Sequence, residues 1–188
     1  MGLSEEIFVA AFNGSDFKPE AAESKNYQHW ISEEDEKRCK ECEYLHGKIW
    51  SLAETPEPEP PLHPNCRCEI EKMYSIKAGT ATINSLDGAD WTLKYEGELP
   101  EYYITEEDIK SLGWRRGRWP SNFAPEKMIT KGAYENKNQH LPDAVGRTWY
   151  EADINYETGK RNAQRVLWSD DGLIFVTYDH YERFYEII

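Results

Sequence analysis

The feature that most constrains the fold is an alternating pattern in residues 148–156, which read TWYEADINY. Aromatic and apolar side chains alternate there with acidic and amide ones at a period close to two, which predicts a β-strand. A turn is expected at 157–159, and a second strand begins at Val166. The sequence SDDG at 169–172 is typical of a hairpin turn, so 173–177 is expected to form a third strand. These residues therefore predict an antiparallel meander.

Four charged or titratable side chains lie on or beside these strands: Glu151, Arg161, Arg165 and His180. A carboxylate base, an imidazole acid and two cations suit the cleavage of RNA, whose 2′-hydroxyl lies next to each phosphate. Arginine suits the phosphate because its planar fork can hold two oxygens and keeps its charge. Asp153 shares a face with Glu151 and could hold the arginines. From spacing alone, a solvated lattice of ion pairs with a surface histidine explains the same residues.

Five short motifs mark the C-terminal half of the chain. They are LP-x-x-YIT at 99–105, LGW at 112–114, GRTW-x-EADINY at 146–156, RN at 161–162 and DHY at 179–181. Together they make residues 82–188 resemble the barnase-like family of microbial, guanyl-specific ribonucleases. The word EADINY is highly specific for that family. The resemblance implies an α+β fold in which N-terminal helices pack on a C-terminal antiparallel β-sheet.

The resemblance also implies roles for individual residues. The general base falls on Glu151 and the general acid on His180. The phosphate-binding arginines fall on Arg161 and Arg165, and Tyr181 lies beside the substrate. The implied reaction is metal-independent endonucleolytic cleavage of single-stranded RNA through a 2′,3′-cyclic phosphate. For a toxin of this kind, the resemblance implies a barnase-inhibitor-like immunity protein as partner.

The polar loop at 133–140 aligns with the family's base-recognition loop, so Asn136, Lys137 and Asn138 are candidate substrate-binding residues. Two departures from the family stand out. Asn138 replaces a guanine-reading glutamate, and an amide lacks the carboxylate that accepts two N–H groups from guanine. Glu106 replaces a lysine that stabilises the phosphorane, and a carboxylate there is expected to repel the phosphate.

All four cysteines lie in the first 70 residues. Cys39-x-x-Cys42 can bring two thiolates to one tetrahedral metal, and Cys66 and Cys68 can complete the four ligands, with His63 as a substitute. We therefore expect a structural zinc ion. Two disulfides and four reduced thiols without a ligand are open alternatives, and the disulfides are disfavoured in a reducing compartment.

The cysteine motifs carry a second resemblance. The segments DEKRCKECEYLHGKIW at 35–50 and PPLHPNCRCEI at 60–70 are similar to the C-terminal signature of phage head-morphogenesis (minor head) proteins. This implies a phage or prophage origin, with capsid proteins as partners and a toxin or effector role for the nuclease half. The alternative is a catalytically weakened, nuclease-derived module that binds within a phage particle.

The chain is expected to contain two units. Residues 1–78 form the small cysteine-rich, zinc-binding unit, and residues 79–188 form the ribonuclease domain, with the join near 75–82. Alternating Pro and Glu at 54–61 predicts an extended spacer within the first unit.

Three helices are expected. A charged run at 31–40, with Ser32 and Asp35 spaced as a capping box, predicts the first. The segment 85–95 predicts the second, and 105–113 the third, which begins with another capping box and ends at a glycine.

The net charge of the chain has the same sign as the charge of its predicted substrate, RNA. The net charge is −13, and residues 79–188 hold 13 Lys and Arg against 19 Asp and Glu. An acidic field slows the approach of a polyanion, so we expect a local basic patch around Arg115, Arg116 and Arg118. Arg115, Arg116 or Lys127 could also supply the missing cation.

No stretch of the sequence is apolar enough to span a membrane. The acidic N-terminus differs from a signal peptide, which begins with basic residues. We therefore expect a protein that is cytoplasmic or delivered with a phage particle.

Overall fold

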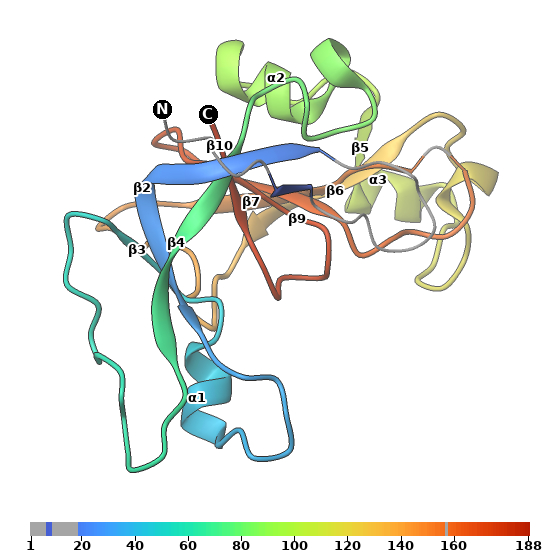
Figure 1. The fold of residues 1–188 in the computed structure, drawn as a ribbon. Helices are drawn as coiled ribbons and strands as arrows, with labels where there is room; N and C mark the ends of the chain where they lie inside the picture. Colours follow the sequence, from blue (N-terminus) through green and yellow to red (C-terminus); the bar gives the residue numbers. More distant parts are fainter. Residues whose placement is uncertain (1–6, 9–18, 157) are drawn as a thin grey trace.

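The structure is a computed structural model, and it describes residues 7–8, 19–156 and 158–188. One large, twisted sheet runs through the described residues, and short helices lie around it (Figure 1). The chain is mixed α/β, with a large sheet and few helices, which confirms the expected α+β fold only in this coarser form. The elements are β1 (Ile7–Phe8), β2 (Glu20–Ile31), α1 (Lys40–Leu45), β3 (Ile49–Ser51), β4 (Glu69–Ile76), η1 (Ser85–Asp87), α2 (Ala89–Tyr95), β5 (Tyr103–Thr105), α3 (Glu106–Ser111), η2 (Pro120–Asn122), β6 (Met128–Tyr134), β7 (Trp149–Asp153), β8 (Arg165–Ser169), β9 (Ile174–Thr177) and β10 (Tyr185–Ile187).

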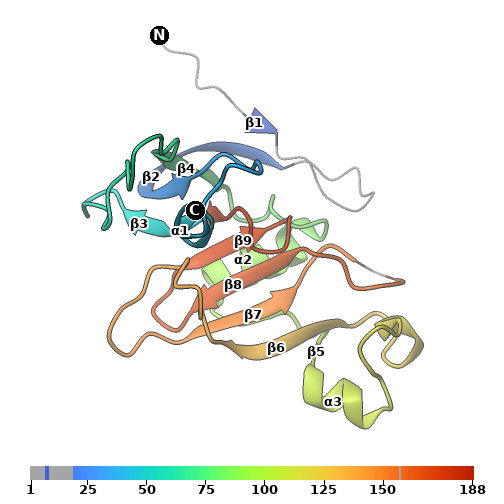
Figure 2. The same ribbon diagram turned by 90° about the horizontal axis from the view of Figure 1, so that it is seen from below.

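The strand order is β1-β2-β4-β10-β9-β8-β7-β6-β5, with β3 paired to β2 beside this path. Strands β6 to β10 follow one another as an antiparallel meander, so the meander predicted from the alternating pattern is confirmed. Two pairings are parallel: β5 with β6, and β4 with β10. The second joins the N-terminal part to the meander, of which strands β6 to β9 lie side by side in Figure 2.

The sheet buries apolar side chains on both faces because residues along each strand point alternately to opposite sides. On one face, Ala152, Val166 and Val176 pack with Leu93 of α2. The opposite face carries a second cluster of Ile49, Met73, Leu141, Trp149, Leu167, Phe175 and Phe184. The second cluster therefore contains residues from the cysteine-rich part as well as from the meander.

The predicted helix at 31–40 is wrong. Strand β2 continues to Ile31, which pairs with Glu69 of β4, and the chain then turns before α1 begins at Lys40. The side chain of Trp30 is completely buried among residues that include Cys42. This pairing and burial outweigh the helix propensity of the charged run.

The two helices predicted in the C-terminal half are present in shorter form. The segment 85–95 divides into the 3-10 turn η1 and the helix α2 at Gly88. Helix α3 begins after Thr105, whose side chain accepts a hydrogen bond from the backbone N–H of Asp108. The predicted spacer at 54–61 contains no helix or strand.

The expected join between the two units falls just after β4, where the sheet passes from one to the other. The parts also touch at the loop that follows β6: the Ile49 N–H donates to the His140 carbonyl at 2.8 Å. Ser24 and Asn26 both donate hydrogen bonds to the Glu186 carboxylate of β10. Within the described residues, no helix is both long and apolar enough to cross a membrane.

Candidate active site

Glu151 lies in the middle of β7, a strand that is paired on both sides. Its side chain is buried on the face that carries Trp149 and Leu167, and only 4% of the residue is exposed. The Tyr181 hydroxyl donates to Glu151 Oε2 at 2.6 Å, and the Lys131 ammonium pairs with Oε1. Burial first, and then this hydrogen bond, raises the pKa of Tyr181, which keeps the hydroxyl a donor.

Asp153 is two residues further along the same face and is completely buried. Arg161 holds it in a bidentate pair, with Nε–Oδ2 at 2.5 Å and Nη2–Oδ1 at 2.6 Å. Arg165, directly opposite on β8, places its Nε 3.1 Å from Oδ1. Burial alone would lower the pKa of Arg161, but the hydrogen bonds and charge of Asp153 raise it overall. The expected role of Asp153 in holding both arginines agrees with these contacts.

His180 follows β9 in a turn where both His180 and Tyr181 have positive φ, 64° and 76°. The backbone N–H of Tyr181 donates to the Thr177 hydroxyl, which fixes this turn. Burial, and then the charges of Arg165 and Lys131, lower the pKa of His180. The Asp179 carboxylate accepts from the Thr177 hydroxyl and the Arg183 N–H.

A cavity of about 410 Å³ brings three of the four predicted catalytic residues together: Arg161, Arg165 and His180. The fourth, Glu151, is joined to this cavity through Lys131, which lines it. Of the expected basic patch, Arg116 and Arg118 line the cavity. Trp114, Gly117 and Lys160 complete the lining.

Lys131 is a site residue that sequence reasoning missed. The available signal is the glycine that follows it in β6, because a glycine inside a strand often marks a bulge. The pairing of β6 with β7 does shift register between Thr130 and Gly132. The strand pattern alone gives no direction for a side chain at such a shift.

Glu106 lies in the first turn of α3 and is tied to two cations. Its carboxylate is 2.7 Å from the Lys110 ammonium and 3.3 Å from the Arg116 guanidinium. Burial acts to raise the pKa of Glu106, but these two cations lower it overall. Glu106 therefore neutralises part of the charge that Arg116 brings to the cavity.

The predicted recognition loop bends back on itself after β6. Asn136 uses its side chain within the loop, donating to the Leu141 carbonyl and accepting from the Leu141 N–H. Asn138 Oδ1 accepts from the His140 N–H at 3.4 Å, and Lys137 pairs with Glu135 at 2.5 Å. All of these contacts are within the loop and none tests substrate binding, so the substrate-binding role of the three residues stays a prediction.

A stacked pair of tyrosines lies beside Glu151, the predicted general base. The rings of Tyr134 and Tyr181 are 5.7 Å apart with 19° between their planes. Aromatic faces of this kind can hold an unstacked nucleobase. Since Tyr181 also contacts Glu151, a nucleobase that packs on this pair would lie beside the predicted general base.

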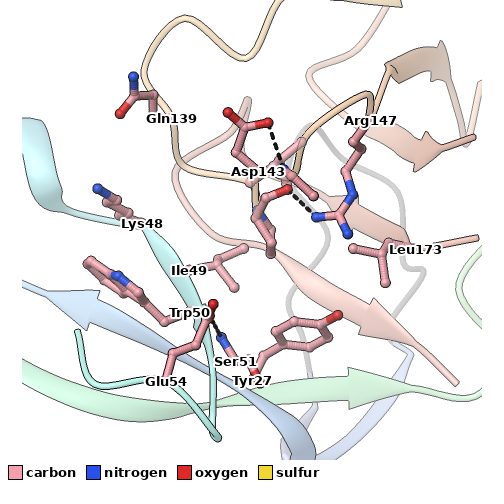
Figure 3. A pocket seen from close by; sticks show the side chains of 13 residues that line it. Tyr27, Lys48, Ile49, Trp50, Ser51, Glu54, Gln139, Asp143, Arg147 and Leu173 are labelled. Carbon is pink, nitrogen blue, oxygen red and sulfur yellow. Dashed lines mark hydrogen bonds between the residues drawn. The ribbon is translucent and has the colours of Figure 1, made fainter. Parts of the chain in front are cut away.

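A second cavity, of about 420 Å³, lies where the N-terminal part meets the loop before β7 (Figure 3). Lys48 and Trp50 line it from the N-terminal part, and Gln139, Asp143 and Arg147 from the loop. Arg147 is held by Asp171, and Glu54 adds a further carboxylate to the lining. This cavity therefore has no excess of positive charge for a phosphate.

The cysteines form a cluster around α1. His63 Nε2 is 3.3 Å from Cys39 Sγ and 3.4 Å from Cys42 Sγ, and Cys66 Sγ is 3.8 Å from Cys42 Sγ. No disulfide joins the four cysteines. Two overlapping groups could hold a metal ion: Cys39, Cys42 and His63, and Cys42, Cys66 and Cys68.

Comparison with known proteins agrees with both resemblances. A family model described as ribonuclease matches residues 88–188, and one described as phage Mu protein F like protein matches residues 5–71. Ribonucleases from Heyndrickxia coagulans and Bacillus intermedius are each 45% identical to 109 residues of this chain, 57% of its length. The aligned segment covers 99% of the first and 67% of the second. With more than half of its length matched in this way, the chain belongs to the ribonuclease family and carries a phage Mu protein F-like segment in front.

Proposed function

We propose that this chain is an endoribonuclease that cleaves single-stranded RNA through a 2′,3′-cyclic phosphate. The observation that carries the proposal is a cavity lined by two arginines, a histidine and a lysine, with that lysine paired to the buried carboxylate of Glu151. Membership of the ribonuclease family supports it. No step of this reaction uses a metal ion.

The proposed reaction has two steps. In the first, Glu151 accepts the proton of the 2′-hydroxyl, and the 2′-oxygen attacks phosphorus. His180 donates a proton to the 5′-oxygen as the P–O5′ bond breaks, which leaves a 2′,3′-cyclic phosphate. In the second, water attacks with the two roles reversed. Arg161 and Arg165 offset the charge of the phosphorane.

The pH dependence follows from these protonation states. The base must be ionised and the acid protonated, so kcat/KM is expected to be bell-shaped in pH. Free carboxylates titrate near about 4.3 and free imidazole near about 6.5. Because the pKa of His180 is lowered, the basic limb is expected below about 6.5.

The decisive test compares two substrates in EDTA. His180→Ala should abolish cleavage of a fluorescent RNA oligonucleotide, but spare part of the activity on a substrate whose leaving group needs no proton. Glu151→Gln should impair both, because the 2′-hydroxyl must still be activated. The reverse pattern would refute these roles. Little or no cleavage of RNA by the wild type would favour the alternative, a catalytically weakened binding module of a phage particle.

A structural zinc ion is proposed for the cysteine cluster. Tetrahedral zinc, with Zn–S near about 2.3 Å and Zn–N near about 2.0 Å, separates its ligand atoms by roughly 3.5–3.8 Å. The observed separations of 3.3, 3.4 and 3.8 Å fit this value. The His63 Nδ1 lies 3.0 Å from the Pro64 carbonyl, which would leave Nε2 free to bind. Cys39, Cys42 and His63 would be ligands, with Cys66 or Cys68 as the fourth.

Elemental analysis tests the zinc proposal. Purified protein should contain about one zinc ion per chain, and His63→Ala should bind it more weakly than a His140→Ala control. Metal-free protein with four titratable thiols would contradict the proposal. Zinc retained equally in both variants would exclude His63 and favour four cysteine ligands.

The remaining proposals concern the biological setting. The phage Mu protein F-like match supports an association with phage particles, and a cytoplasmic or particle-delivered toxin is proposed from it. Expression should arrest bacterial growth for the wild type and not for His180→Ala; equal growth would contradict a toxin. Partners would be RNA, capsid proteins and a barnase-inhibitor-like protein. Co-sedimentation with particles and equimolar inhibition of cleavage test the last two.

A further inference from the structure

Lys131 occupies an irregular point of the sheet. Thr130 pairs with Ala152 and Gly132 with Glu151, so Lys131 is an extra residue opposite the bond between them. Gly132 has a φ of +75°, which side chains rarely permit. The Thr130 hydroxyl donates to the Glu151 carbonyl at 3.0 Å and so holds the bulge against β7. Such bulges redirect side chains and are frequent beside active sites.

The redirected side chain reaches both the base and the cavity. The Lys131 ammonium pairs with Glu151 Oε1, and the side chain lines the cavity with Arg161, Arg165 and His180. It is 25% exposed, whereas the Glu151 side chain is 5% exposed. Lys131 therefore lies between the buried carboxylate and the space that the phosphate is proposed to enter.

Lys131 changes the net charge of the inner site. Arg161 and Arg165 both pair with Asp153, and the two guanidinium groups equal in number the carboxylates of Asp153 and Glu151, so these four groups together are neutral. Lys131 adds one positive charge to them. A phosphorane is anionic, and a preorganised cation directed at the place where that charge develops stabilises the transition state.

The other cations at the cavity are less suited to this role. Arg116 is 76% exposed and already pairs with Glu106. Arg118 and Lys160 are exposed, and solvent screens such charges strongly. Lys131 alone among the lysines that line this cavity is held by a buried ion pair.

We infer that Lys131 is a catalytic residue: it holds the Glu151 carboxylate in an ion pair before the reaction and stabilises the phosphorane during it. When Glu151 accepts the 2′-hydroxyl proton, it becomes neutral and its ion pair with the Lys131 ammonium is lost. The ammonium can then interact with the negative charge that develops on the phosphate oxygens. This inference rests on the proposed ribonuclease function.

The test replaces the ammonium with neutral groups. Lys131→Met keeps the length of the side chain, and Lys131→Gln keeps a hydrogen-bond donor for Glu151 in case the first variant does not fold. Each should lower kcat/KM on RNA by about 10²–10³-fold, as for other charge-stabilising groups. Lys131→Arg should retain most of the activity. Lys94→Met, which removes a charge whose ammonium binds the Ile187 carbonyl, is the matched control.

The pH profile separates catalysis from a merely structural role. Without Lys131, the basic limb should move to higher pH, since Lys131 is one cause of the lowered pKa of His180. If either neutral variant folds, keeps activity within about threefold of the wild type and has the same pH profile, the inference about Lys131 is overturned, but the proposed function is not. A wild-type protein that does not cleave RNA would overturn the proposed function, and this inference with it.

Discussion

Replacing Asp153 by asparagine is expected to remove a large part of the stability of this protein. The substitution keeps the shape of the side chain but removes the charge that faces Arg161 and Arg165. Asp153 is 0% exposed and the two arginine side chains are 17% and 5% exposed, so water can do little to replace the lost charge. The amide also turns a donor toward guanidinium groups that can only donate.

Breaking a buried ion pair by removing one partner costs about 3–5 kcal/mol. Domains have a total stability of about 5–15 kcal/mol, so this is a substantial fraction. With a urea m value of about 2 kcal/mol per molar, the unfolding midpoint should fall by roughly 2 M.

Asp171→Asn provides a matched control. Asp171 makes a similar multidentate pair with Arg147, at 2.8–3.0 Å, but its side chain is 47% exposed. Exposed pairs contribute about 0–1 kcal/mol, so the control should shift the midpoint by less than roughly 0.5 M. Equal midpoint shifts for the two variants would refute the claim that burial makes the Asp153 cluster decisive.

Four further predictions concern other parts of the molecule. Burial lowers the pKa of His29 to about 4, so stability should be complete above about pH 6.5 and fall toward pH 4. Urea unfolding should show that the free energy of unfolding falls by about 3 kcal/mol across that pH range, and that His29→Gln loses less. An equal fall in the wild type and in His29→Gln would contradict this prediction. With Asn138 in the recognition loop, dinucleotide assays should give weaker guanine selectivity than in the resembling family, and a strong preference for GpN would show this wrong. Glu106→Lys should raise kcat/KM, most at low salt, because it adds a cation and frees Arg116; a neutral or lower rate would refute it. Residues 79–188 alone should melt cooperatively, but with several kcal/mol less stability, since the fully buried Met73 and its contacts are lost; a non-cooperative melt would contradict the proposed boundary.

The meander could be predicted because its pattern is local. Alternation along Trp149–Asp153 and the turn before Leu173 depend on neighbours in the sequence, and the structure places the strands where these signals indicate. Family motifs then identified the residues around the cavity. Both kinds of signal are written in short stretches of the chain.

The missed features depend on contacts between distant segments. The run after Trp30 has helical propensity, but pairing with β4 extends the strand to Ile31. Lys131 enters the site only because β6 loses register against β7. The pKa of His180 is lowered by burial first, and then by the charges of Arg165 from β8 and Lys131 from β6. None of these long-range arrangements follows from the spacing of residues.

The central claim is tested most directly by the chemical nature of the first product. We predict that the wild-type protein, incubated with a single-stranded RNA oligonucleotide in EDTA, yields fragments that end in a 2′,3′-cyclic phosphate. His180→Ala, at the same concentration, should yield none. Fragments of the same kind from His180→Ala, or wild-type fragments that end only in a 3′-hydroxyl, would contradict the account.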